Sequence, residues 1–233
     1  FHVYYLTISG HMPYSNNRVA NQYRDLVDPL PYSDTTKNYV ATVIEVDRAL
    51  EYLIQRLEEA GKLDSTLIVA APDHIPYFDV ATLEELAGES FGSSEDLEYL
   101  KEGNINFDVY RNSLILWSAS MEEPVEVDKV CCQVDILPTV SNLLGLEYDS
   151  RMLDGSDILS DNEGLVVFSS KCWRSDRGFY DRYTSTFTPA AGVSMTAEEQ
   201  EDYVSAMKLV QYKLDSTALV IENDFYGYVF GNG

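Results

Sequence analysis

The strongest constraint in this sequence is an amphipathic repeat between residues 38 and 61. Apolar side chains recur there every three or four residues, which predicts one helix over 38–60 with cap candidates at 34–36 and Gly61 as its C-terminal stop. An apolar run at residues 3–8 precedes this helix, and another at 66–71 follows it. Both runs are typical of strands covered on both faces. Strand, helix and strand in this order predict a βαβ unit with parallel strands.

The rest of the chain alternates short apolar runs with helical patterns. We expect strands at 113–117 and 165–169, a short helix within 130–144, and a long helix over 197–222 that begins with the capping box Thr196 to Glu199. Residues 217–221 alone could also form a strand. The predicted fold class is α/β, a layered sandwich with a largely parallel sheet flanked by helices.

Charge is distributed unevenly along the 233 residues. Asp and Glu number 39 against 16 Lys and Arg, a formal charge of −23, which disfavours a nucleic-acid or anionic-membrane binder. Residues 79–128 hold thirteen acids with Lys101 and Arg111 as their only bases, and we interpret them as a solvated acidic insertion. No run approaches the roughly 20 apolar residues that span a bilayer. Because the chain opens directly on an apolar run, we expect a piece of a longer protein.

Two histidines follow predicted strands at the same offset. His11 lies three residues after Ile8, and His74 lies three residues after Ala71. At the carboxyl ends of parallel strands both imidazoles would face one crevice. Asp73 next to His74 combines an oxygen and a nitrogen donor, which suits Mn²⁺, Zn²⁺ or Fe²⁺ better than Ca²⁺. The alternative is a hydrogen-bonded loop pair without a metal.

The sequence offers no convincing nucleophile. It has no Gly-x-Ser-x-Gly elbow and no phosphate-binding glycine loop. Cys131, Cys132 and Cys172 fit neither a disulfide framework nor a zinc site, and no histidine adjoins them, so we expect structural thiols.

Ordered blocks over nearly the whole chain carry a family resemblance. They are YLTISGHMPY at 5–14, YVA at 39–41 with DRAL at 47–50, APDH at 71–74, QVDILPT at 133–139 with NLLG at 142–145, YDSR at 148–151, DILS at 157–160, KCW at 171–173, SDRG at 175–178 and ENDFY at 222–226. These blocks resemble the lipoteichoic acid synthase family, membrane-anchored phosphoglycerol transferases of the sulfatase and alkaline phosphatase superfamily. The resemblance implies that residues 1–233 are the C-terminal part of a sulfatase-like extracellular catalytic domain.

The resemblance also assigns roles to single residues. Asp73 and His74 match the pair that ligates the catalytic metal, usually Mn²⁺, and His11 matches the histidine that contacts the phosphoglycerol substrate. Family members take their threonine nucleophile and a glutamate ligand from an upstream segment with which nothing here aligns, so no catalytic nucleophile is assigned to this chain. The family's glycines around the Asp-His pair are replaced by Pro72 and Pro76, which stiffen the loop.

The implied reaction transfers glycerol phosphate from phosphatidylglycerol to a growing polymer through a metal-activated threonine. The implied partners are the phosphatidylglycerol head group and the polymer, without nucleic acid, and contact with the cell membrane comes only through helices upstream of this chain. We expect the 233 residues alone to bind Mn²⁺ weakly and to lack transferase activity.

Two other functions stay open at this point. One is a sulfatase or phosphodiesterase hydrolase of the same superfamily, and the other is an extracellular binding domain that keeps the fold without the reaction. The blocks at 171–178 and 222–226 favour the transferases over the hydrolases.

Overall fold

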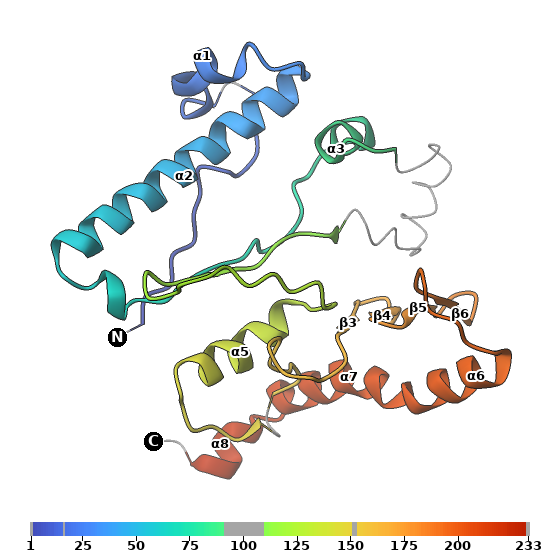
Figure 1. Cartoon of the computed structure of the whole chain (residues 1–233). Helices are drawn as coiled ribbons and strands as arrows, with labels where there is room; N and C mark the ends of the chain where they lie inside the picture. The colour runs from blue at the N-terminus through green and yellow to red at the C-terminus, as the bar shows by residue number, and fades with distance from the viewer. Residues whose placement is uncertain (1, 16, 91–109, 151–152, 232–233) are drawn as a thin grey trace. The chain divides into compact units, whose positions relative to one another are not determined.

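The structure is a computed structural model that describes residues 2–15, 17–90, 110–150 and 153–231. The chain forms two compact units, Phe1–Pro124 and Val125–Gly233, here called the N-terminal and C-terminal units (Figure 1). Within the predicted acidic insertion, residues 91–109 lie outside the described residues. The described residues on either side of them contain helix α3, Val80–Ala87, and strand β2, Ile115–Trp117.

Helix α2, Asp34–Glu59, confirms the helix predicted from the apolar repeat. It begins at Asp34 rather than at residue 38, because the hydroxyl of Ser33 accepts a hydrogen bond from Thr36 N–H at 3.3 Å and so supplies the N-cap. The predicted cap candidates at 34–36 therefore lie inside the first turn. Gly61 follows the helix with a φ of 63°, a left-handed conformation that glycine adopts without steric cost.

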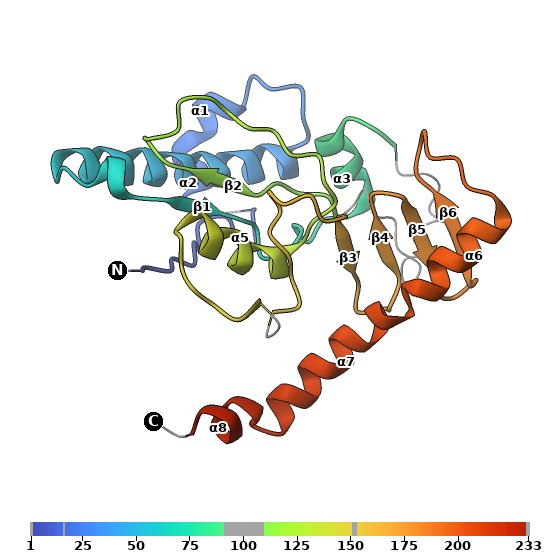
Figure 2. The same ribbon diagram turned by 60° about the horizontal axis from the view of Figure 1, so that its bottom comes forward.

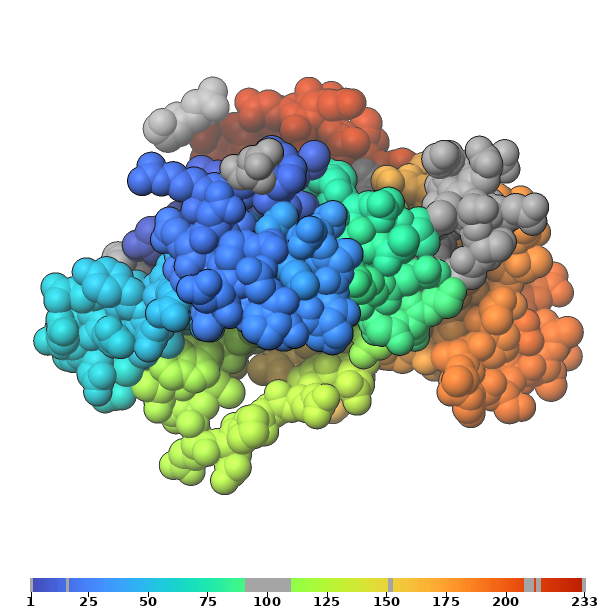
Figure 3. Space-filling model, turned by 90° about the horizontal axis from the view of Figure 1, so that it is seen from above, coloured from blue at the N-terminus to red at the C-terminus, as the bar shows by residue number. Residues whose placement is uncertain are grey.

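The core of the N-terminal unit lies along α2. Two short segments, η1 (Ala20–Tyr23) and α1 (Arg24–Val27), pack against this helix. The buried centre and the partly buried apolar residues around it are Ala20, Val27 and Ala41 with Tyr23, Leu30, Val40 and Ile44. Helix α3, Val80–Ala87, also contacts α2, and Figure 3 shows it in green beside the blue part of the chain that includes the start of α2.

Two short strands confirm two of the predicted strand positions. After η2 (Leu63–Ser65), strand β1 covers Ile68–Ala70 and pairs with β2, Ile115–Trp117. The pairing is antiparallel, with Val69 opposite Leu116. The loop from residue 71 to residue 79 leaves β1 and leads into α3, and it carries Asp73 and His74.

The prediction of a largely parallel sheet is wrong. In the described residues both sheets are antiparallel, and residues 2–15 contribute no strand to either of them. The apolar side chains of residues 3–8 that we expected to be buried are between 49% and 78% exposed. An apolar run becomes a strand only when another backbone pairs with its N–H and C=O groups. Without that pairing, the predicted βαβ unit does not form.

A four-stranded antiparallel sheet organises the C-terminal unit, in the order β3-β4-β5-β6. Its strands are β3 (Leu165–Val167), β4 (Trp173–Ser175), β5 (Gly178–Asp181) and β6 (Thr186–Pro189). Only the first was predicted. The aromatic and threonine residues between 173 and 189, separated by short polar turns, are the strand signal that the sequence analysis overlooked. Figure 2 shows the four strands side by side, with α6 next to β6.

Trp173 is the centre of this sheet's packing. Its side chain is 1% exposed and its ring lies 5.4 Å from Tyr180, 5.6 Å from Phe187 and 5.7 Å from Tyr203, measured between ring centroids. Tyr203 belongs to α6, so these rings attach the helix to the sheet.

The predicted helix within 130–144 is present as η4 (Gln133–Asp135) followed by α5 (Ile136–Leu143). Pro138 lies in the first turn of α5, where the missing N–H costs no helical hydrogen bond. The buried carboxylate of Asp135 accepts hydrogen bonds from the backbone N–H groups of Cys132 and Ser156, both at 2.8 Å.

The long C-terminal helix that the sequence predicted is two helices. Helix α6 covers Ala197–Ala206 and α7 covers Lys208–Glu222, with the short α8, Phe225–Phe230, after them. The capping box at Thr196 is confirmed. Met207 interrupts the helix because its ψ is 0°, far from the helical value of about −42°. Within the described residues, no helix combines the length and the apolar character that a membrane crossing requires.

Candidate functional site

Asp73 and His74 form a preorganised pair in the loop after β1. The Oδ1 atom of Asp73 accepts a hydrogen bond from His74 N–H at 2.9 Å, which leaves Oδ2 directed at the imidazole. Nδ1 of His74 lies 2.6 Å from the carbonyl oxygen of Ile75. A carbonyl oxygen only accepts, so Nδ1 carries the hydrogen, and in the neutral imidazole Nε2 then presents a lone pair. That lone pair belongs to the atom that faces Asp73.

The spacing of these two donor atoms fits one metal ion. Asp73 Oδ2 and His74 Nε2 are 3.7 Å apart. Two ligand atoms that each lie about 2.1 Å from a tetrahedral ion are separated by about 3.4 Å, so a small closure of the pair suffices. A backbone carbonyl on the remote imidazole nitrogen is also the usual support of a histidine ligand. In the part of the chain that the structure describes, no group of three or more His, Cys, Asp or Glu is placed to hold a metal.

His11 has the same local arrangement as His74. Its Nδ1 lies 2.7 Å from the carbonyl oxygen of Met12, so in the neutral imidazole its Nε2 also presents a lone pair. Its backbone N–H donates to the carbonyl oxygen of Ile8 at 3.0 Å, which closes a turn. The imidazole is exposed, and this suits a group that contacts a substrate.

The loops that carry His11 and His74 meet through three aromatic rings. Tyr14 lies three residues after His11, Phe78 lies four residues after His74, and their ring centroids are 4.9 Å apart. Tyr39 of α2 completes the group at 5.4 Å from Tyr14 and 5.2 Å from Phe78. Sequence analysis missed these contacts, because nothing local to the three segments predicts that they pack together.

Two tyrosines of this ring cluster are neutral in the physiological pH range. Burial raises the pKa of Tyr14, with a further contribution from Tyr39, and burial also raises the pKa of Tyr39. The cluster therefore brings no negative charge to the loops.

The prediction that the two histidines face one crevice rests on the expectation that both follow parallel strands. Residues 3–8 form no strand and β1 has an antiparallel partner, so that reason is wrong. The contact between Tyr14 and Phe78 brings the two loops together by another route. A shared site for both imidazoles stays a prediction.

Helix α3 holds the far end of the His74 loop against α2. The carboxylate of Glu85 accepts hydrogen bonds from Ser33 N–H and from the Ser33 hydroxyl, both at 2.6 Å, and from the Thr36 hydroxyl. The hydrogen bonds from Ser33 and Thr36 lower the pKa of Glu85. A carboxylate at a helix N-terminus is also favoured by the helix dipole. The loop between β1 and α3 is thus anchored at both ends.

The cysteines lie in the C-terminal unit, and two of them have thiols that resist ionisation. Burial, with a smaller contribution from Asp135, raises the pKa of Cys132 to about 11 and also raises the pKa of Cys131. A thiol that stays protonated is a poor nucleophile. Cys172 is buried with its sulfur 3.9 Å from Asp181.

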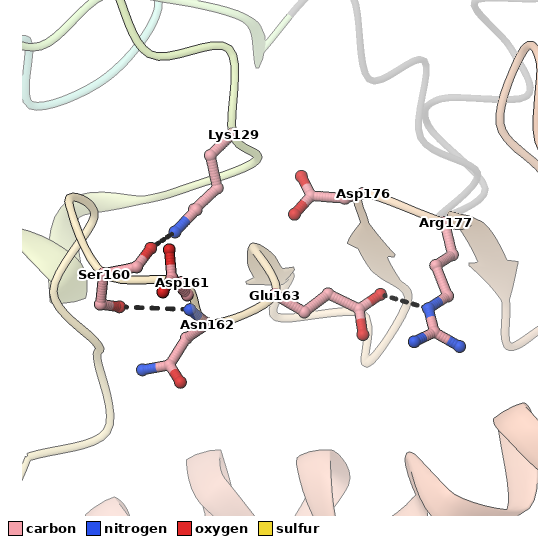
Figure 4. A pocket seen from close by; sticks show the side chains of 7 residues that line it. All are labelled: Lys129, Ser160, Asp161, Asn162, Glu163, Asp176 and Arg177. Atoms are coloured by element: carbon pink, nitrogen blue, oxygen red, sulfur yellow. Dashed lines mark hydrogen bonds and ion pairs between the residues drawn. The ribbon is translucent and has the colours of Figure 1, made fainter.

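A polar cavity of about 400 Å³ lies on the C-terminal unit (Figure 4). Its lining residues are Lys129, Ser160, Asp161, Asn162, Glu163, Asp176 and Arg177. Asp176 accepts the N–H groups of Val130 and Gly164 at 2.9 and 2.6 Å, and Arg177 lies 3.3 Å from Glu163. These internal bonds occupy much of the lining, and none of the predicted site residues belongs to it.

Comparisons with known proteins bear on both units. Residues 1–146 match the family model described as Sulfatase. Lipoteichoic acid synthase 2 of Bacillus subtilis is 24% identical over 233 residues, 96% of this chain and 32% of that protein. Lipoteichoic acid synthase-like YvgJ of the same organism is 27% identical and is matched over 69% of this chain and 25% of its own length. Steryl-sulfatase of Rattus norvegicus is 28% identical over 52% of this chain and 21% of its own length.

A solved structure has the same fold. The crystal structure of the lipoteichoic acid synthase LtaP from Listeria monocytogenes superposes with a TM-score of 0.62 at 23% identity, over 90% of this chain and 52% of that one. The chain thus spans between a fifth and a third of the length of the curated relatives named here.

Proposed function

Because the chain belongs to the sulfatase family, we propose that it is part of a phosphoglycerol transferase of the lipoteichoic acid synthase type. The resemblance to lipoteichoic acid synthases that the sequence blocks predicted is confirmed. In this proposal the complete enzyme transfers glycerol phosphate from phosphatidylglycerol to a polymer at the outer face of the cell membrane. The threonine nucleophile and a further glutamate ligand come from a segment upstream of residue 1.

The observation that carries the proposal is the 3.7 Å separation between Asp73 Oδ2 and His74 Nε2 in a chain of this family. These two residues would hold the divalent ion, which we propose is Mn²⁺. When bound, such an ion lowers the pKa of a coordinated hydroxyl and stabilises negative charge on a phosphoryl group. Asp73 contributes the negative charge of the pair, and the bond from His74 to Ile75 keeps Nε2 free for the metal.

His11 would act on the substrate. With its Nδ1 hydrogen held by Met12, its Nε2 accepts a hydrogen bond from a glycerol hydroxyl when neutral and donates one to a phosphate oxygen when protonated. Since the protein carries a formal charge of −23, an anionic head group needs a local positive charge to approach, which the bound divalent ion would supply.

The alternative enzymatic function is hydrolysis of a sulfate or phosphate ester. It is supported by the family match and by the similarity to steryl-sulfatase. The transferase is favoured because lipoteichoic acid synthase 2 is matched over 96% of this chain, against 52% for the sulfatase. A binding domain without catalytic activity is the remaining alternative.

Titration calorimetry with Mn²⁺ tests the metal pair on the 233-residue chain. We expect weak binding that is lost in Asp73→Asn and in His74→Gln. Asp64→Asn is the matched control, because Asp64 lies in η2 of the same unit and its loss removes the same charge. Equal Mn²⁺ binding by the wild type and the Asp73→Asn variant would contradict the proposed ligands.

Turnover assays separate the three functions. A longer protein that includes the upstream segment should release diacylglycerol from a phosphatidylglycerol analogue and extend a glycerol phosphate acceptor. Release of sulfate from an aryl sulfate instead would support the hydrolase, and inactivity on both substrates would support the binding domain. The 233-residue chain alone should be inactive, because metal binding does not supply an attacking hydroxyl. Transfer by that chain would refute the upstream nucleophile.

A further inference from the structure

The proposed site is divided between two loops that local structure does not hold together. His11 lies in residues 2–15, which contain neither helix nor strand, and the hydrogen bonds described for its ring and N–H reach only Met12 and Ile8. The bonds that orient Asp73 and His74 are likewise between sequence neighbours. Each loop therefore shapes its own functional groups, whereas a tertiary contact has to set the relation between the loops.

The ring cluster of Tyr14, Tyr39 and Phe78 supplies such a contact. The three pairs of ring centroids lie between 4.9 and 5.4 Å apart, and both pairs that involve Tyr39 are edge-to-face. These separations and orientations are the ones aromatic pairs favour. Tyr14 is buried although most of its segment is exposed, so its ring is the point at which the His11 loop is fixed.

Tyr39 differs from the other two rings because it belongs to the unit's most regular element. It lies one turn after Thr36, whose hydroxyl binds Glu85 of α3, and two residues before Ala41, which is fully buried in the core. Its backbone is therefore fixed independently of either loop. From this position its ring contacts one residue of the His11 loop and one of the His74 loop.

We infer that Tyr39 is a positioning residue that holds the His11 loop against the Asp73–His74 loop by packing against both Tyr14 and Phe78. The importance of Tyr39 for catalysis rests on the proposed function, whereas its role in holding the two loops together does not. Removal of the Tyr39 ring eliminates two of the three ring contacts and leaves every bond that orients Asp73, His74 and His11 in place.

Replacing the ring separates positioning from metal binding. We expect Tyr39→Leu to release the loops while its Mn²⁺ affinity stays at the wild-type value, since the ligand pair is oriented locally. Tyr39→Phe keeps both ring contacts and should behave like the wild type. Tyr52→Leu is the matched control, because Tyr52 lies on the same helix and is 64% exposed. Circular dichroism establishes that α2 is retained in each variant.

Nuclear magnetic resonance gives two readouts that need no enzymatic activity. Without metal, Overhauser effects between the rings of Tyr14 and Phe78 should be present in the wild type, Tyr39→Phe and Tyr52→Leu, and lost in Tyr39→Leu. With Mn²⁺, whose paramagnetism broadens nearby signals, the imidazole signals of both His74 and His11 should broaden in the wild type. In Tyr39→Leu the broadening of His74 should persist and that of His11 should be lost.

Two results would overturn the inference. The first is the absence of Overhauser effects between the rings of Tyr14 and Phe78 in the wild type. The second is that Tyr39→Leu keeps these effects and that Mn²⁺ still broadens its His11 imidazole signals. If Tyr39→Leu fails to fold, Tyr39→Met provides the same readouts, because its long side chain favours the helix and lacks the ring. A wild-type chain in which Mn²⁺ broadens no histidine would contradict the proposed metal pair, while the metal-free Overhauser effects still decide the role of Tyr39. In the longer enzyme, Tyr39→Leu should lower kcat/KM by about 100-fold, the size of effect expected from a misplacement of about 1 Å.

Discussion

Replacing Gly155 by alanine should destabilise the C-terminal unit more than any conformational preference of glycine explains. An added Cβ would overlap the carbonyl oxygen of Val134 and lie 2.8 Å from the backbone N of Asp135. These neighbours are backbone atoms of η4, so no side chain can rotate away. The φ angle of Gly155 is not positive, and alanine is therefore compatible with its backbone conformation. The predicted cost is steric.

The structure limits how that overlap can be relieved. Overpacking of backbone against a new methyl group costs about 1–3 kcal/mol if the surroundings shift slightly. If the segment around Gly155 moves away instead, Asp135 loses the N–H of Ser156 at 2.8 Å and Thr139 loses the N–H of Ile158 at 3.0 Å. A hydrogen bond to a charged group contributes about 1.5–3 kcal/mol and a neutral one about 1 kcal/mol. The first route costs about 1–3 kcal/mol and the second about 2.5–4 kcal/mol, so we expect a loss of about 2–3 kcal/mol.

Urea unfolding followed by tryptophan fluorescence measures this loss. A Trp117→Phe background leaves Trp173, in the core of the C-terminal sheet, as the only reporter. With a slope of about 2 kcal/mol/M, the midpoint should fall by about 1–1.5 M. Gly192→Ala is the control: its added Cβ meets open space, but its φ is 84°, so it should cost only about 1 kcal/mol. A loss in Gly155→Ala no larger than in this control would refute the steric reasoning.

Three further predictions follow from ionisable groups. Hydrogen bonds from Ser33 and Thr36 lower the pKa of Glu85 in the folded chain. Its contribution to stability is therefore present above the pKa of an unfolded glutamate, about 4.3, and is lost as the pH falls through the lower folded pKa. Urea unfolding at a series of pH values should show the stability difference between wild type and Glu85→Gln shrinking over that range. The hydroxyl of Tyr203 donates to Glu163 at 2.6 Å and lies 2.8 Å from the Ser175 hydroxyl, so Tyr203→Phe should cost about 1 kcal/mol in the same assay. Burial raises the pKa of Tyr203 to about 12. In a pH titration followed by absorbance, the tyrosinate signal that the wild type shows and Tyr203→Phe lacks should therefore appear only near pH 12. Burial likewise raises the pKa of Cys132 to about 11, so iodoacetamide at pH 8 should leave it unmodified until urea unfolds the chain, as judged by mass spectrometry.

Elements stabilised by neighbours in the chain were predictable from sequence. Helix α2 is an example, because its periodicity, its N-terminal polar residues and Gly61 all lie within one segment. The capping box at Thr196 is another. The break at Met207 was not predictable, since the apolar pattern continues through it and a single ψ of 0° separates α6 from α7.

Strands were less predictable because their hydrogen-bond partners lie elsewhere. The runs at 66–71 and 113–117 do contain β1 and β2, but the sequence does not specify that they pair in opposite directions. Residues 3–8 have the same apolar character and remain unpaired and exposed in the structure. Composition indicates that a segment can form a strand, whereas a second backbone decides whether it does.

The candidate site divides in the same way. The sequence alone suggested the candidate donor atoms, because Asp73 and His74 are adjacent and a resemblance to a known family points to them together with His11, and their roles stay proposals. Only the tertiary structure decided how those residues are held: Nδ1 of each histidine bonded to the next carbonyl, and Tyr14, Tyr39 and Phe78 packed together from three distant segments. The physical reason is that chemical identity belongs to single residues, whereas the relative position of two loops depends on apolar contacts that form only when the whole unit folds.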